Sequence, residues 1–113
     1  MARAQKRLVG PTVLGVTNTS ESSLCTPASG TKVIMRYIKA TNTDPSTTHY
    51  LCLSIAGADV AANRVIDQIP ILGGAEYERW ILWNIEATEI LCSSADAASK
   101  ITLTMNGDLY TLD

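Results

Sequence analysis

Short segments in which apolar and polar residues alternate recur along this chain, with turn-forming residues between them. The alternation is clearest in residues 50–55 and in residues 100–105. The apolar members of these two segments are Leu51, Leu53, Ile55, Ile101, Leu103 and Met105. Successive side chains of a β-strand point to opposite faces of the sheet, so this alternation predicts two half-buried strands.

A longer strand is predicted at residues 31–41, between a Pro-Ala-Ser-Gly turn and a second turn at residues 42–46. Pro27 fixes its own φ and Gly30 tolerates positive φ, so both residues favour the first turn. The run between the turns is rich in β-branched residues, which favour strands.

The two faces of this predicted strand differ in character. One face carries Val33, Met35 and Tyr37, and the other carries Lys32, Ile34, Arg36 and Ile38. An outward face that mixes isoleucine with lysine and arginine is typical of a protein contact surface, and also of a partly covered sheet.

Weaker strand signals lie at residues 8–17, 24–26 and 64–69. Pro11 interrupts the first of these strands and places it at the edge of a sheet, because proline cannot donate a ladder hydrogen bond. Near the end of the chain, the Asn-Gly pair at residues 106–107 predicts a two-residue hairpin turn, with a returning strand at 109–112.

Residues 75–92 fit two interpretations. Tyr77, Trp80, Ile81 and Ile85 fall at helical spacing, and the segment contains neither glycine nor proline. Read as strands, Ile81 and Ile85 share a face with a tryptophan, and a break near residues 86–87 separates a second strand at 88–92. The recurrence of turn signals elsewhere favours strands, as in a sandwich.

These segments predict an all-β fold: an antiparallel β-sandwich, jelly-roll-like, with about seven or eight strands. The chain of 113 residues fits a single domain at residues 8–113, preceded by an N-terminal arm at residues 1–7. The predicted core comprises Val33, Met35, Leu51, Leu53, Ile55, Ile81, Trp83, Ile101, Leu103 and Met105.

Charge is distributed unevenly along the chain. Residues 1–40 hold six basic residues and one acidic residue, a net charge of +5, whereas residues 41–113 hold three basic and ten acidic residues, a net charge of −7. This pattern suits a head-to-tail contact between copies of the chain better than a nucleic-acid surface, which needs a concentrated basic face. An ordinary solvated surface has the same appearance. The candidate protein-interface residues are Arg3, Lys6, Arg7, Ile34, Arg36 and Ile38.

No motif in the sequence indicates catalysis, a cofactor or a metal. The single histidine, His49, stands beside a threonine-rich turn and is interpreted as an ordinary surface residue. The three cysteines are odd in number and widely spaced, which favours reduced, mostly buried thiols over disulfides or a zinc site. We therefore expect a non-enzymatic protein without catalytic residues, cofactors or metal ligands. No apolar run is long enough to span a bilayer, and the N-terminus lacks a signal-peptide pattern.

Several segments, taken in order, resemble small virion structural proteins of tailed bacteriophages, especially those that infect actinobacteria. The segments are Arg7-Leu-Val-Gly-Pro-Thr, Pro27-Ala-Ser-Gly-Thr-Lys, Ala40-Thr-Asn42, the alternating residues 51–55, Ile71-Leu-Gly-Gly with the tryptophan-bearing strand, and Ile101-Thr-Leu-Thr-Met-Asn-Gly107-Asp-Leu. One segment departs from the pattern: the late strand usually begins after a glycine or a comparable acidic turn, where this chain has Glu86-Ala-Thr-Glu89.

The resemblance implies a non-enzymatic β-sandwich component of the virion, associated with the tail or tail tip or, alternatively, decorating the capsid. It implies other virion proteins and further copies of the chain as partners, with assembly in the host bacterial cytoplasm and neither nucleic acid nor membrane as a partner. A carbohydrate- or receptor-binding β-sandwich is a further alternative, in which Trp80 or Trp83 would stack on sugars. Because these two tryptophans would face opposite sides of a strand, the core is the more natural place for one of them.

Overall fold

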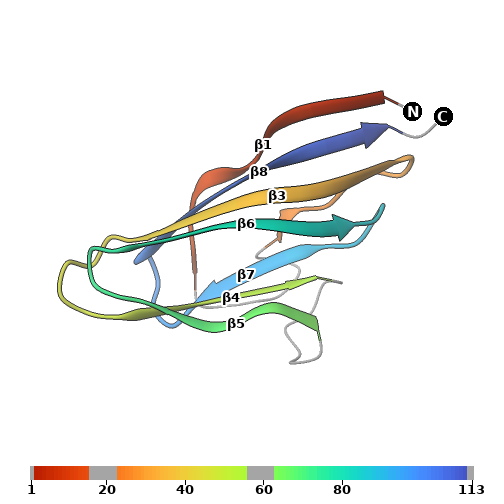
Figure 1. Ribbon diagram of the computed structural model, residues 1–113. Coiled ribbons are helices and arrows are strands. Elements are labelled where there is room, and N and C mark those ends of the chain that lie inside the picture. Colours follow the sequence, from red (N-terminus) through yellow and green to blue (C-terminus); the bar gives the residue numbers. More distant parts are fainter. Residues whose placement is uncertain (1, 16–22, 56–62, 112–113) are drawn as a thin grey trace.

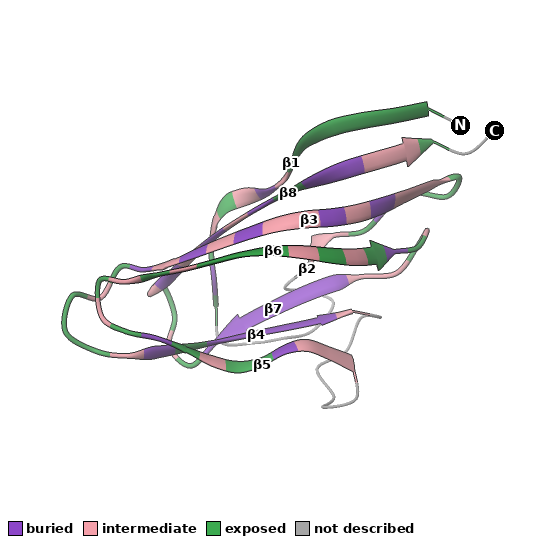
Figure 2. Ribbon diagram, in the orientation of Figure 1, coloured by how far each residue is buried: buried purple, intermediate pink, exposed green. Residues whose placement is uncertain are grey.

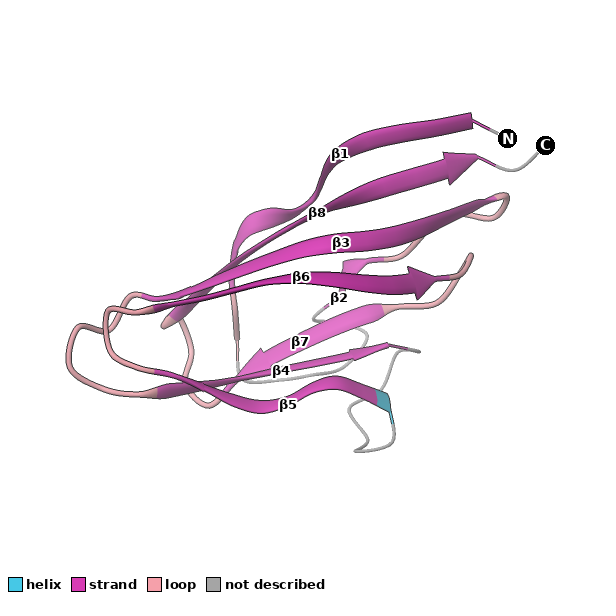
Figure 3. Ribbon diagram, viewed as in Figure 1, coloured by secondary structure: helices cyan, strands magenta, loops and turns pink. Residues whose placement is uncertain are grey.

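The computed structural model describes residues 2–15, 23–55 and 63–111. Within them the chain forms eight β-strands joined by loops (Figure 1, Figure 3). The strands are β1 (Ala2–Val13), β2 (Ser23–Cys25), β3 (Thr31–Asn42), β4 (His49–Ile55), β5 (Arg64–Ile71), β6 (Glu76–Ile85), β7 (Leu91–Ala95) and β8 (Ile101–Thr111). Residues 76–85 therefore form a strand, and the helical interpretation of the segment is wrong. The second strand, predicted at 88–92, instead begins at Leu91 and runs to Ala95.

The strands form two four-stranded antiparallel sheets, ordered β1-β8-β3-β6 and β2-β7-β4-β5. The first strand pairs with the eighth, the second with the seventh, the third with the sixth and the fourth with the fifth. The same pairing would result from folding one long hairpin into two packed sheets. This is the jelly-roll order. The predicted fold class is confirmed.

The core lies between the two sheets and is built largely from the alternating residues. Seven predicted core residues are buried, namely Val33, Met35, Leu51, Leu53, Ile101, Leu103 and Met105. The other three, Ile55, Ile81 and Trp83, are half-buried and pack against this core. Figure 2 shows β7 buried along its whole length, as expected for an inner strand of a covered sheet.

A β-bulge in β3 changes which side chains enter the core. Met35 pairs with Gly107 of β8 and Tyr37 pairs with Asn106, so Arg36 is an extra residue on β3. A bulge of this kind turns consecutive side chains to one face and reverses the alternation beyond it. Ile38 is consequently fully buried, and its predicted place on the outward face is wrong.

The predicted hairpin turn at residues 106–107 is also wrong, because β8 runs through both residues without a break. Gly107 has a different role there. A Cβ atom added to it would collide with the backbone carbonyl oxygen of Ile34 on the neighbouring strand. Glycine is therefore required at this point because β3 and β8 approach each other closely at the bulge.

The N-terminal boundary also differs from the expectation. Residues 2–7, expected to form an arm, instead belong to β1 and pair with residues 106–111 of β8. Their side chains are all exposed. β1 is an edge strand and contains Pro11, as predicted. The predicted strand at 8–17 thus begins earlier, ends at Val13, and residues 16–17 lie outside the described residues.

Candidate functional site

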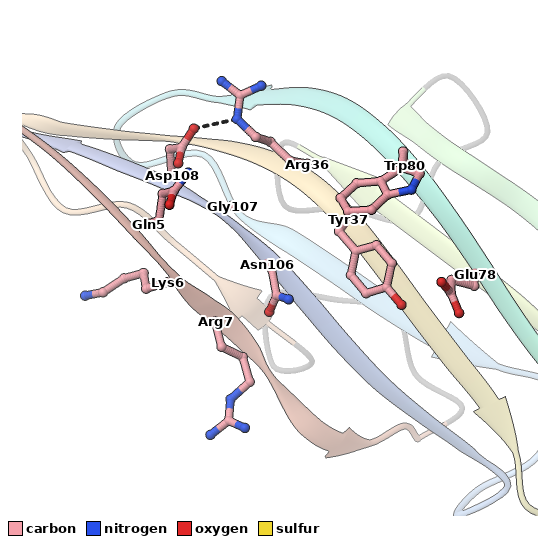
Figure 4. A pocket seen from close by; sticks show the side chains of 10 residues that line it. All are labelled: Gln5, Lys6, Arg7, Arg36, Tyr37, Glu78, Trp80, Asn106, Gly107 and Asp108. Atoms are coloured by element: carbon pink, nitrogen blue, oxygen red, sulfur yellow. Dashed lines mark hydrogen bonds and ion pairs between the residues drawn. The ribbon is translucent and has the colours of Figure 1, made fainter.

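The outer face of sheet β1-β8-β3-β6 carries an open groove of about 740 Å³ that crosses all four strands (Figure 4). It is lined by Gln5, Lys6, Arg7, Arg36, Tyr37, Glu78, Trp80, Asn106, Gly107 and Asp108. Its volume falls within the range of small-molecule sites, roughly 300–1,000 Å³. The register places Gln5, Arg7, Asn106 and Asp108 of this lining on the sheet face away from the core.

Two aromatic rings form the β3–β6 end of the groove. Tyr37 and Trp80 face each other across the two strands, with ring centroids 4.9 Å apart and planes inclined by 53°. Trp80 nevertheless keeps 77% of its surface exposed. Burial raises the pKa of the Tyr37 hydroxyl, and a hydrogen bond with Glu78 raises it further. A tryptophan braced on one side and open on the other presents a flat apolar platform to solvent.

An ion pair with a buried carboxylate lies beside the aromatic rings. Asp108 is only 1% exposed, and its Oδ2 atom accepts a hydrogen bond from Nε of Arg36. Nε of Arg3 lies 3.8 Å from the other carboxylate oxygen, Oδ1. The hydrogen bonds to Asp108 and to Tyr110 raise the pKa of Arg36, which therefore stays charged. The guanidinium of Arg36 is thus held in place by a carboxylate that is itself fixed in the sheet.

The two ends of the groove carry opposite charge. Lys6 and Arg7 lie at the β1 end, and Glu78 lies beside the aromatic rings at the β6 end. Between them, the amide side chains of Gln5 and Asn106 supply both hydrogen-bond donors and acceptors. The arrangement provides an aromatic platform, a fixed guanidinium and neutral polar groups on one continuous surface.

The structure brings some of the sequence-predicted interface residues together and separates others. Lys6, Arg7 and Arg36 line the groove, and Arg3 reaches its buried carboxylate. Ile34 is half-buried on β3, and Ile38 lies in the core.

Sequence reasoning named Trp80 as a sugar-stacking residue in one alternative and missed the other residues of the groove. Alternation predicts Tyr37 on the inward face, because nothing in the sequence marks the bulge at Arg36. The Asn-Gly pair predicts a turn at Asn106. Asp108 follows that turn motif directly, and a lone acidic residue gives no sign that it is buried.

A second polar cluster lies at the start of β4. His49 is 6% exposed, so its interpretation as a surface residue is wrong. Its Nδ1 atom lies 3.0 Å from Oδ1 of Asp96, and its Nε2 atom lies 3.0 Å from Oδ2 of Asp44. Oδ1 of Asp96 also accepts a hydrogen bond from the backbone amide of Tyr50.

The carboxylates shift the titration of this cluster. The hydrogen bond with Asp44 raises the pKa of His49, against the opposing effect of burial, and Asp96 adds to the rise. The hydrogen bond with His49 lowers the pKa of Asp44 to about 2. Burial acts to raise the pKa of Asp96, but the hydrogen bonds from Tyr50 and His49 outweigh it and lower the pKa. Carboxylates face both ring nitrogens, so His49 links two loops to β4 in an arrangement that favours the charged imidazolium.

The cysteines and the potential metal ligands are considered next. Cys25, Cys52 and Cys92 form no disulfide with one another, and burial raises the pKa of Cys25 and makes it less reactive. Within residues 2–15, 23–55 and 63–111, no three His, Cys, Asp or Glu side chains are arranged to hold a metal ion. No helix in the described part of the chain is long and apolar enough to cross a membrane.

No family model matches the chain, and no curated protein matches it.

Proposed function

We propose that the protein is a non-enzymatic structural component of a tailed-phage virion, associated with the tail or tail tip. Decoration of the capsid is the alternative location. The observation that carries the proposal is the strand order β1-β8-β3-β6 and β2-β7-β4-β5, because jelly rolls of this kind recur in viral capsid proteins. One fold hosts many functions, so the fold supports the proposal only together with the ordered sequence segments that resemble small phage virion proteins.

The surface supports an assembly role. Arg3, Lys6 and Arg7 lie on an exposed edge strand. Residues 41–113, in contrast, carry a net charge of −7. Leu82 on the opposite edge strand, β6, is 71% exposed. Charged edges set the orientation of partners, and exposed apolar side chains contribute affinity. Repeated copies of the chain and neighbouring virion proteins are the partners that such edges suit.

Electron microscopy of particles from the phage that encodes the chain tests this proposal. Antibodies against the purified domain are expected to label intact particles, at the tail for the first location and across the head for the alternative. Mass spectrometry of gradient-purified particles is expected to find the chain as a stoichiometric component. Its absence from purified particles would overturn the proposal.

A receptor- or carbohydrate-binding module is a second candidate function. One observation favours it: Trp80, the most exposed large apolar residue among those described, lies on a polar groove rather than on a flat surface. Soluble domains rarely leave a tryptophan uncovered without a partner.

A further inference from the structure

We propose that the groove on the outer face of sheet β1-β8-β3-β6 binds an acidic oligosaccharide. One sugar ring stacks on Trp80, and a sugar carboxylate binds Arg36. This inference does not depend on where the protein lies in a particle, because it concerns the isolated domain.

The aromatic end of the groove suits the apolar face of a pyranose ring. Trp80 is 77% exposed, yet its orientation is fixed because the ring of Tyr37 lies against it at 4.9 Å. An indole held this way loses little conformational entropy when a ligand stacks on its open side. Glu78, which bonds to the Tyr37 hydroxyl, provides an acceptor beside the platform for a sugar hydroxyl.

Arg36 suits a carboxylate because it is positioned before any ligand arrives. Asp108 holds it through Nε, and Figure 4 shows the two terminal nitrogens directed away from Asp108. The Arg36 side chain is 43% exposed, whereas Asp108 beneath it is 1% exposed. A guanidinium presents donors in a rigid fork that matches the two oxygens of a carboxylate. Asp108 is thus a positioning residue, and Arg36 makes the contact.

The charge of the groove favours an acidic sugar over a neutral one. Lys6, Arg7 and Arg36 outnumber Glu78 and Asp108 along it, although the whole chain carries a net charge of −2. Asp108 neutralises Arg36, which leaves Lys6 and Arg7 against Glu78 and a net positive charge for an anionic ligand.

The same distribution disfavours single-stranded nucleic acid. Grooves for single strands are basic throughout and carry several stacking platforms. This groove has basic residues mainly toward β1 and one exposed platform.

Titration of the full chain with three probes tests the inference. The probes are a hexamer of galacturonic acid, maltohexaose as the neutral sugar, and an oligothymidylate of similar length. Tryptophan fluorescence reports stacking at Trp80, and calorimetry measures affinity. The expected result is binding of the galacturonate hexamer with a change in tryptophan emission, and affinity at least about tenfold lower for the other two probes.

Matched variants assign the binding to the groove. Trp80→Ala is expected to weaken binding of the galacturonate hexamer about tenfold or more. Leu82→Ala, an equally exposed substitution on the same strand outside the groove, is expected to leave it unchanged. Arg36→Lys keeps the charge beside Asp108 but removes the fork, and is expected to lower affinity for the acidic hexamer while affinity for maltohexaose stays the same. Thermal melting of each variant shows that the fold is retained.

Three outcomes would overturn the inference. They are no binding of the galacturonate hexamer at millimolar concentration, equal affinity in the Trp80→Ala and Leu82→Ala variants, and tighter binding of the oligothymidylate than of the sugar. None of these outcomes bears on whether the chain is found in purified particles, so the structural proposal is tested separately.

Discussion

The imidazole of His49 lies 3.0 Å from the carboxylate of Asp44, measured from Nε2 to Oδ2, at the point where β4 begins. Four residues lie between the two along the chain, and the turn that they form is closed by this contact. Oδ1 of the same carboxylate accepts a hydrogen bond from the backbone amide of Ser46, so Asp44 organises the turn as well as the histidine.

This contact predicts how stability depends on pH. The pKa of His49 is raised in the folded protein. The contribution of His49 to the free energy of unfolding is therefore complete below the ordinary pKa of 6.5 and is lost as the pH rises through the pKa of the folded state. The pKa of Asp44 is lowered to about 2, so its contribution is complete above its ordinary value of 3.8 and is lost as the pH falls toward 2. The free energy of unfolding is therefore expected to be greatest between about pH 4 and about pH 6.5.

Urea denaturation across this pH range measures the effect. The variant His49→Gln keeps a hydrogen-bonding side chain but cannot gain a proton. It is expected to have a lower free energy of unfolding than the parent near pH 5. Its free energy of unfolding is not expected to decline above about pH 6.5. An unchanged decline in His49→Gln would show that another group titrates there.

Truncation of the core residue Leu103 is expected to destabilise the domain strongly. Leu103 has no exposed surface and lies on an inner strand of its sheet. Leu103→Ala should lower the free energy of unfolding by about 2–5 kcal/mol, because it leaves a cavity between the sheets. Thr102→Ala, on the opposite face of the same strand, should cost about 0.5 kcal/mol or less in the same denaturation experiment. Similar costs for both would mean that the outer face of β8 is covered as fully as the inner one.

A side chain at Gly107 is expected to disturb the bulge. The methyl group of Gly107→Ala would meet the carbonyl oxygen of Ile34, which belongs to the backbone and has little room to move. We expect a loss of about 1–3 kcal/mol in the free energy of unfolding. Gly15→Ala is the matched control, because a Cβ there has no neighbour among the described residues within 4 Å. If both substitutions have the same effect, the close approach of β3 and β8 is not what restricts this position.

Deletion of residues 1–7 separates the role of the β1 backbone from that of its charges. The deletion removes the partner of residues 106–111 and turns that part of β8 into an open edge. It is expected to lower the melting temperature and to promote aggregation, measured by light scattering, because unpaired edges recruit other chains. The triple variant Arg3→Gln, Lys6→Gln and Arg7→Gln keeps the strand, and is expected to stay monomeric to the same extent as the parent. Equal aggregation of the deletion variant and the triple variant would mean that the charges of β1, and not its backbone, prevent aggregation.

Alternation allowed the sandwich and most of its core to be predicted, because period-two burial is a property of each strand alone. Leu51, Leu53, Ile101 and Leu103 follow it and are buried. Ile38 does not, because one extra residue at Arg36 reverses the pattern without leaving a mark in the sequence.

The other errors share a physical cause. Asn106 and Gly107 have strong turn propensity, but pairing with β3 on one side and β1 on the other keeps them extended. His49 is buried because Asp96, 47 residues further along the chain, completes its hydrogen bonds. The groove likewise draws on all four strands of one sheet. Contacts of this kind depend on which strands become neighbours, and local sequence patterns do not predict strand pairing.

The strand order also constrains how the chain acquires its structure during synthesis. Among the eight strands, only β4 and β5 are both consecutive in the chain and hydrogen-bonded to each other. β1 emerges from the ribosome first, yet its ladder partner, β8, is translated almost a hundred residues later. Until then, apolar strands such as β3 have one edge without a partner, and long-range pairing makes their folding slow. The nascent chain thus passes through an interval in which a chaperone, or a neighbouring copy on the same messenger RNA, competes for the edges that β8 eventually occupies.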